Sequence, residues 1–151
     1  MAKRNADNNY NTNLASEYLM MSHLSRMGFD AYLSLGNKKG VDIIVKTQKG
    51  AICIVEVKGV NANMDWLIGN SGRFPAASNM FYALVGFDGK IQDITSPAKF
   101  YMIPSDKLAR ENEHKISGNE KTVYLSHKFI RENYEEHLNN FKSLTLYLEN
   151  N

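Results

Sequence analysis

The chain has 151 residues, of which 43% are hydrophobic, 11% aromatic and 23% charged. These values are typical of one folded domain and exclude disordered, collagen-like and two-domain architectures. Its 18 basic and 16 acidic residues give a net charge of +2, too small to indicate nucleic acid by itself. The single Cys53 excludes an internal disulfide, and neither a secretion signal nor a membrane-spanning apolar run is found. We therefore expect a cytoplasmic protein without membrane contacts.

The N-terminal part of the chain divides into a polar and an amphipathic segment. Residues 1–11 are rich in Asn and predict a flexible arm, which leaves residues 12–151 as a single domain. Apolar side chains then recur at steps of three and four residues, which predicts an amphipathic helix capped by Thr12 or Asn13 and closed by Gly28. The predicted apolar stripe consists of Leu14, Tyr18, Met21, Leu24 and Met27.

The middle of the sequence predicts strands. Residues 29–36 alternate with a period of two, and the β-branched runs 41–46 and 51–59 predict a hairpin whose turn contains Gly50. Residues 61–78 show no single pattern, and their structure stays open. Residues 80–87 and 99–103 predict two central strands, each covered on both faces.

The C-terminal part predicts a short helix capped by Ser105 and ending near residue 110, a short strand at 122–125, and a final amphipathic helix opened by Ser126. Packing against the core is the favoured role of that last helix, and a dimer face is the second. The order of elements predicts an α/β fold, bordering on α+β, with one mixed sheet flanked by helices.

The end of the second hairpin strand carries the residues with chemical potential. Glu56 and Lys58 are two residues apart and point to the same face, where burying their charges is costly unless they pair or hold an ion. A turn at 48–50 pairs residues whose numbers sum to 97–99, which places Asp42 beside Glu56. Carboxylates converging beside a lysine suit a hard cation such as Mg²⁺, which clamps a phosphate and activates water.

These residues carry a family resemblance. Asp42, followed by Glu56-Val57-Lys58 at the end of the next strand and preceded by a helix containing Glu17, resembles the PD-(D/E)xK nuclease superfamily, particularly its Holliday-junction-resolvase-like and restriction-endonuclease-like members. The resemblance implies an αβββαβ core and hydrolysis of DNA phosphodiesters with Mg²⁺, for which Mn²⁺ can substitute. It further implies that Asp42 and Glu56 ligate the metal, that Lys58 assists the nucleophile, and that Glu17 completes or organises the metal site. The small size of the chain and the resemblance together suggest a homodimer with two sites.

A purely structural alternative exists for each of these residues. Glu56 and Lys58 can form a salt bridge at the edge of the sheet, Asp42 can close a turn, and Glu17 can be a solvated helix residue. The rival function is a catalytically inactive nuclease-like fold that binds DNA or another protein.

The distribution of charge suggests where DNA approaches. Residues 36–75 contain six basic and three acidic residues, a net charge of +3, whereas the remainder carries −1. This excess predicts that a phosphate backbone arrives on the side of the hairpin. The candidate DNA contacts are Lys38, Lys39, Trp66 and Arg73, with solvated lysines and a buried Trp66 as the alternatives.

Overall fold

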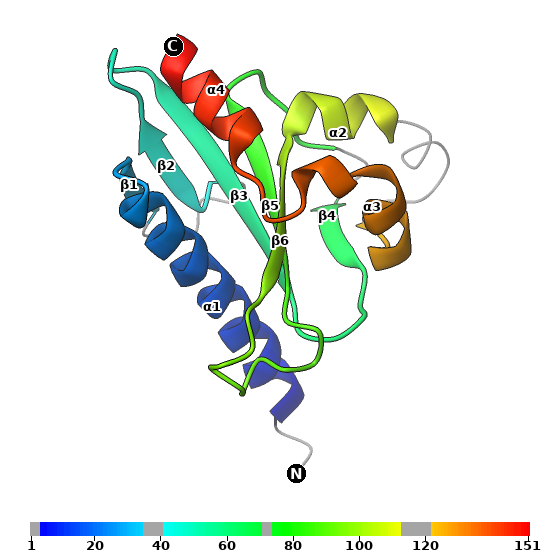
Figure 1. The fold of residues 1–151 in the computed structure, drawn as a ribbon. Helices are drawn as coiled ribbons and strands as arrows, with labels where there is room; N and C mark the ends of the chain where they lie inside the picture. Colours follow the sequence, from blue (N-terminus) through cyan, green and yellow to red (C-terminus); the bar gives the residue numbers. More distant parts are fainter. Residues whose placement is uncertain (1–3, 35–40, 71–73, 113–121) are drawn as a thin grey trace.

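The computed structural model describes residues 4–34, 41–70, 74–112 and 122–151. A five-stranded sheet with the order β1-β2-β3-β5-β6 forms its centre (Figure 1). The strands β3 and β5 are parallel, and the other neighbours are antiparallel. The predicted fold class, a mixed sheet flanked by helices, is therefore confirmed. The strands are β1 (Asp30–Leu33), β2 (Ile43–Lys46), β3 (Ile52–Val60), β5 (Met80–Gly86) and β6 (Lys99–Pro104).

The β2–β3 hairpin has the predicted register. Ile43 pairs with Val55 and Val45 pairs with Cys53, so paired residue numbers sum to 98. Gly50 takes the positive φ of 86° that the tight turn requires. Continued by one residue, this register puts Asp42 level with Glu56 at the start of the hairpin.

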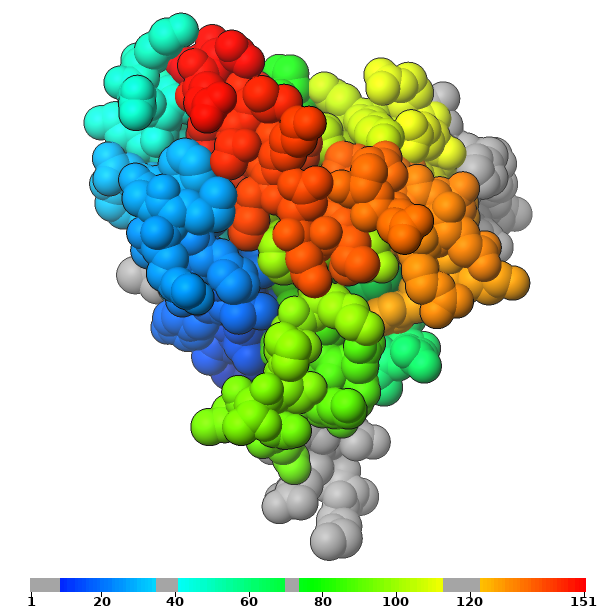
Figure 2. All heavy atoms as spheres, in the orientation of Figure 1, coloured from blue at the N-terminus to red at the C-terminus, as the bar shows by residue number. Residues whose placement is uncertain are grey.

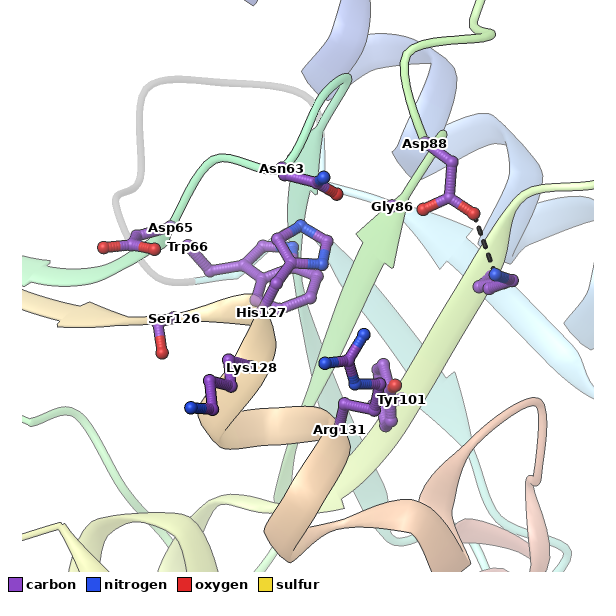
Figure 3. Close-up of a pocket in the computed structure, with 11 residues that line it drawn as sticks. Asn63, Asp65, Trp66, Gly86, Asp88, Tyr101, Ser126, His127, Lys128 and Arg131 are labelled. Carbon is purple, nitrogen blue, oxygen red and sulfur yellow. Dashed lines mark ion pairs between the residues drawn. The ribbon is translucent and has the colours of Figure 1, made fainter.

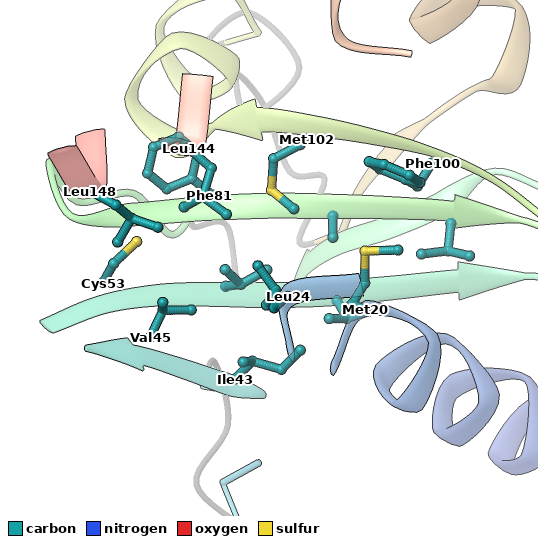
Figure 4. Packing of buried hydrophobic residues seen from close by; sticks show 14 residues of the cluster. Met20, Leu24, Ile43, Val45, Cys53, Phe81, Phe100, Met102, Leu144 and Leu148 are labelled. Atoms are coloured by element: carbon teal, nitrogen blue, oxygen red, sulfur yellow. The ribbon is translucent and has the colours of Figure 1, made fainter. Parts of the chain in front are cut away.

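Two apolar cores lie on opposite faces of the sheet. Helix α1 (Arg4–Arg26) and helix α4 (Lys142–Asn150) cover one face, where Leu24, Val55 and Leu144 are fully buried (Figure 4). The other face is covered by α2 (Ser105–Glu111), α3 (His127–Asn133) and a two-stranded sheet. In the view of Figure 2, α1, α4 and the loop between β5 and β6 lie at the molecular surface, together with α2 and α3.

The connection between the parallel strands β3 and β5 differs from what the resemblance implies. An αβββαβ core has a helix there, whereas this chain has the strand β4 (Trp66–Asn70). β4 pairs antiparallel with β7 (Thr122–Leu125) and forms the separate two-stranded sheet. Part of the segment 61–78, which the sequence left open, is therefore a strand with Trp66 and Ile68 buried and Leu67 exposed.

Helix α1 differs from the prediction in its start and in its buried face. It begins at Arg4, so residues 4–11 belong to the helix and not to a flexible arm, and neither Thr12 nor Asn13 caps it. No Gly or Pro interrupts this stretch, and extending an existing helix costs little. Tyr18 and Met27 are exposed, because the stripe that faces the sheet is rotated; it consists of Thr12, Ser16, Met20 and Leu24. Gly28 closes the helix as predicted, with a φ of 83°.

The C-terminal part also differs from the prediction in detail. β6 is an edge strand of the sheet rather than a central one, but Asn139 N donates to Phe100 O and covers this edge. The expected single helix is divided into α3, η2 (Glu135–His137) and α4. Its core packing and its Ser126 cap are confirmed, since Ser126 Oγ accepts from the amide of Phe129 at 3.2 Å.

Helix α2 spans the predicted residues without the predicted cap. Ser105 is its first residue, and its hydroxyl bonds to the backbone of Ala77 instead of to the helix. None of the helices in the described part of the chain combines the length and apolar character needed to cross a bilayer.

Candidate functional site

The predicted site residues gather where β3 extends beyond its neighbour. β2 starts at Ile43, opposite Val55, whereas β3 continues to Val60, so residues 57–60 pair with β5 on one side only. Asp42 lies at this step and accepts a hydrogen bond from Val57 N at 2.7 Å through Oδ2. The first backbone amide of the free edge is therefore bound by a carboxylate.

A close helix–strand contact brings α1 to the same place. A Cβ atom on Gly59 would clash with Ser16 Oγ and would lie 2.9 Å from Ser16 Cβ and 3.0 Å from Thr12 O. Only glycine therefore allows the helix to approach this closely. Ser16 is fully buried, and its hydroxyl donates to Thr12 O at 2.7 Å, which satisfies it inside the contact. Glu17, the next residue, is carried to the free edge of β3.

Glu17, Asp42 and Lys58 line one cavity of about 750 Å³. Burial raises the pKa of the Asp42 carboxyl, while the Val57 amide and the charge of Lys58 oppose this rise. Burial also raises the pKa of Glu17; the negative charge of Asp42 adds to this effect, and Lys58 opposes it. The three side chains thus interact electrostatically, as members of one site do.

Glu56 lies beneath Lys58 rather than on the cavity wall. It is 3% exposed and stands in register with Tyr82 of β5. Lys58 Nζ is 2.5 Å from Glu56 Oε1, and the Lys58 side chain is 28% exposed, so it reaches from the buried carboxylate to the cavity. Glu56 Oε2 is buried and has no hydrogen-bond partner among the residues that the structure describes. Burial and the charge of Glu56 both raise the pKa of Tyr82, so this phenol stays protonated.

The donor set suits a hard cation that keeps some water ligands. Glu56 Oε2 is unpartnered, and Oδ1 of Asp42 forms no hydrogen bond with the described residues. Within the described ranges, no three His, Cys, Asp or Glu side chains converge in a way that could hold a metal ion. Mg²⁺ commonly binds through one or two carboxylates plus waters and substrate phosphates, and it does not require such a group. The two carboxylate oxygens without a described partner are therefore compatible with a hard cation whose remaining ligands are waters.

The predicted DNA contacts are not supported in the part of the chain that the structure describes. Trp66 is 1% exposed, its Nε1 donates to Val85 O at 3.0 Å, and it stacks on His127 at 4.0 Å between ring centroids. Its predicted role of stacking on a base is therefore contradicted, because neither face of the ring is open. Lys38, Lys39 and Arg73 lie outside the described residues.

Three of the six basic residues in 36–75 lie in the described part of the chain, and two of these three lie away from the site. Lys46 ends β2, four residues beyond Asp42, which is about 13 Å along a strand. Lys49 lies in the hairpin turn, and its Nζ donates to Asn150 O at 3.3 Å. Among the lysines of this segment that the structure describes, only Lys58 lines the cavity.

Sequence reasoning missed one exposed aromatic residue of the site. Tyr124 of β7 is 52% exposed, pairs across the strands with exposed Leu67, and lines the same cavity as the carboxylates. The strand prediction at 122–125 contained the relevant signal, since alternate residues of a two-stranded sheet face solvent. Only the pairing of β7 with β4 reveals that this face adjoins Asp42.

Comparison with known proteins supports the fold alone. No protein-family model matches the sequence, and no curated protein is similar to it. Among solved structures, a bacterial homing endonuclease, I-Ssp6803I, is similar with a TM-score of 0.54. The match covers 92% of this chain and 92% of that chain at 15% sequence identity. The chain therefore shares its overall fold with that endonuclease.

Proposed function

We propose that this protein is a metal-dependent endonuclease of the PD-(D/E)xK type, which hydrolyses phosphodiester bonds in DNA. The observation that carries the proposal is the buried Glu56 carboxylate, whose Oε1 pairs with Lys58 at 2.5 Å and whose Oε2 has no partner. A buried carboxylate that is half satisfied is costly to a fold, and such costs are concentrated at functional sites. The likeness in fold to a homing endonuclease supports the same function.

Each site residue has a distinct role in this proposal. Asp42 and Glu56 would hold Mg²⁺ or Mn²⁺, and Glu17 would complete or organise the site from α1. The metal, when bound, supplies positive charge that polarises a phosphate and lowers the pKa of water. Lys58 reaches the cavity with its ammonium group, where it can orient the attacking water or stabilise charge on the phosphate. The Val57 amide fixes the Asp42 carboxylate by its hydrogen bond.

One observation favours the second candidate, a nuclease-like fold that binds DNA or protein without cleaving it. The Glu56–Lys58 ion pair is the interaction that the purely structural alternative requires, and it satisfies the lysine without any metal. The two candidates differ in what happens to DNA when the pair is altered, and a cleavage assay therefore separates them.

The experiment compares wild type with Glu56→Gln and Lys58→Met on plasmid, branched and single-stranded DNA, with Mg²⁺ or Mn²⁺. Lys107→Met is the matched control, because Lys107 Nζ is 2.8 Å from Glu136 Oε1 and its side chain is 30% exposed, close to the 28% of Lys58. Circular dichroism verifies that every variant is folded. We expect each site variant to lose roughly 100-fold or more in cleavage rate and the control to keep it.

Cleavage that survives both site substitutions would refute the mechanism. Binding of DNA without cleavage of any substrate would favour the inactive module.

We also propose a homodimer with two sites, because a single small domain encloses little of a duplex. Light scattering coupled to size-exclusion chromatography tests this proposal, and a monomer at micromolar concentration would remove it.

A further inference from the structure

A second cavity, of about 360 Å³, adjoins the site on the other side of the start of β4. Trp66 and Asp65 line both cavities and form the wall between them. Arg131 and His127 of α3, together with Tyr101 of β6, line the second cavity (Figure 3). Nothing in the proposed chemistry at Asp42 and Glu56 uses these residues.

Arg131 is the principal cation of this cavity. Its guanidinium group points into the space beside Tyr101 (Figure 3). It forms no ion pair and no hydrogen bond with any residue that the structure describes. A guanidinium carries five N–H donors in a fork that matches the oxygens of phosphate or carboxylate groups. An arginine that lines a concavity and has no partner among the described residues is suited to an anionic ligand.

His127 provides a second, independent indication of a ligand. Its Nε2 atom is buried and has no hydrogen-bond partner in the described part of the chain, although its ring is fixed by stacking on Trp66. Burial lowers the pKa of His127; the charges of Asp88 and Asp65 oppose this lowering, and those of Arg131 and Lys99 add to it, which favours the neutral ring. A neutral imidazole can donate one hydrogen bond from the nitrogen that carries the proton. A neutral imidazole on the cavity wall beside the Arg131 guanidinium is compatible with an oxyanion.

The remaining charges leave the cavity positive. Lys99 and Lys128 line it along with Arg131, against the carboxylates of Asp65 and Asp88. Asp88 is already neutralised by Lys99, whose Nζ is 2.9 Å from its Oδ2, the ion pair dashed in Figure 3. The positively charged side chains of this cavity therefore outnumber the negatively charged ones. The excess positive charge comes from α3, and the wall formed by Asp65 and Trp66 separates it from Lys58.

We infer that this second cavity binds a backbone phosphate of the nucleic acid whose scissile phosphate lies in the first cavity. The inference rests on the proposed function, because it assigns the two cavities to one strand that crosses the wall formed by Asp65 and Trp66. Arg131 binds the phosphate oxygens, and the His127 ring forms part of the cavity wall beside them. These residues position the strand and take no part in bond cleavage. A contact to a backbone phosphate fixes the register of the nucleic acid and does not read its sequence.

The test measures binding of a labelled DNA oligonucleotide by fluorescence anisotropy, in EDTA, between about 50 and about 200 mM salt. One phosphate contact fewer reduces the slope of log affinity against log salt by about 0.7 to 0.9, so the affinity loss over this range becomes roughly threefold smaller for Arg131→Gln. Arg110→Gln is the matched control, because Arg110 is an exposed helical arginine that lines neither of the two cavities. Arg131→Lys should restore the slope but only part of the affinity.

An unchanged slope in Arg131→Gln would overturn the inference, as would an equal change in Arg110→Gln. Inorganic phosphate at millimolar concentration identifies the source of the phosphate. If it displaces DNA from wild type but not from Arg131→Gln, the cavity is a site for the free anion, and the backbone assignment is refuted.

The binding assay is independent of cleavage. A reduced slope without cleavage by any variant would remove the proposed nuclease activity alone, whereas cleavage that depends on Glu56 with an unchanged slope would remove this inference alone.

Discussion

Replacing Glu56 and Lys58 together by Leu and Met should stabilise the fold while abolishing cleavage. Glu56 is 3% exposed, and one of its oxygens has no partner. Apolar replacement of a buried ion pair stabilises proteins by about 1–4 kcal/mol. Because the Lys58 side chain is 28% exposed, it keeps part of its hydration, and we expect the lower half of this range, about 1–2 kcal/mol. For a chain of this size such a gain raises the melting temperature by roughly 2–8 °C.

Thermal and chemical denaturation in EDTA measure this effect in wild type, both single variants and the double variant. Lys58→Met alone leaves a buried carboxylate without a cation and should cost about 3–5 kcal/mol. Glu56→Leu alone should cost less, because the Lys58 ammonium can turn towards the cavity and water. A double variant that is less stable than wild type would show that the pair exists for stability, and retained cleavage would show that it has no catalytic role.

Three further predictions concern neighbouring residues. Gly59→Ala should lower the free energy of unfolding by about 1–3 kcal/mol through overpacking against Ser16, and a Ser16→Gly background should show less than additive loss in denaturation experiments. Asp42→Asn should raise the free energy of unfolding at neutral pH and lose this advantage below about pH 4. The pKa of Asp42 is raised in the folded state, so the folded chain binds more protons than the unfolded chain, and wild-type stability falls as pH rises from the unfolded to the folded pKa of Asp42. Melting curves recorded across this pH window measure the effect. Tyr124→Ala should weaken binding of single-stranded DNA by about 1–3 kcal/mol in anisotropy titrations, whereas Tyr32→Ala, with 56% exposure on β1 against 52% for Tyr124, should have no effect.

Local sequence determines the part of the site that could be predicted. The β2–β3 register depends on a tight turn with a glycine at positive φ and on alternating β-branched residues, all within a short stretch of chain. This register alone brings Asp42 level with Glu56. The shared face of Glu56 and Lys58 likewise follows from the period of a strand, and the structure joins them in an ion pair.

Contacts between distant segments determine the part that could not be predicted. The buried stripe of α1 contains Thr12 and Ser16 instead of Tyr18, because the helix packs onto Gly59, a residue far along the chain. Hydrophobic periodicity favours large apolar residues at the buried face, but a close backbone approach requires small ones. The outer face of the β4–β7 sheet with Tyr124 was missed for a similar reason, since the pairing joins segments on either side of β5 and β6.

Trp66 illustrates how a residue can serve nucleic-acid binding without touching the ligand. It was predicted as a stacking contact, but its indole is buried and donates to Val85 O, which ties the start of β4 to β5. Its ring also stacks on His127 and so fixes the first turn of α3, from which Arg131 projects. In the proposed arrangement Trp66 therefore sets the spacing between the carboxylate cavity and the phosphate cavity. A smaller residue at this position would loosen the wall that the two cavities share, so its effect on DNA binding would arise from geometry and not from a lost contact.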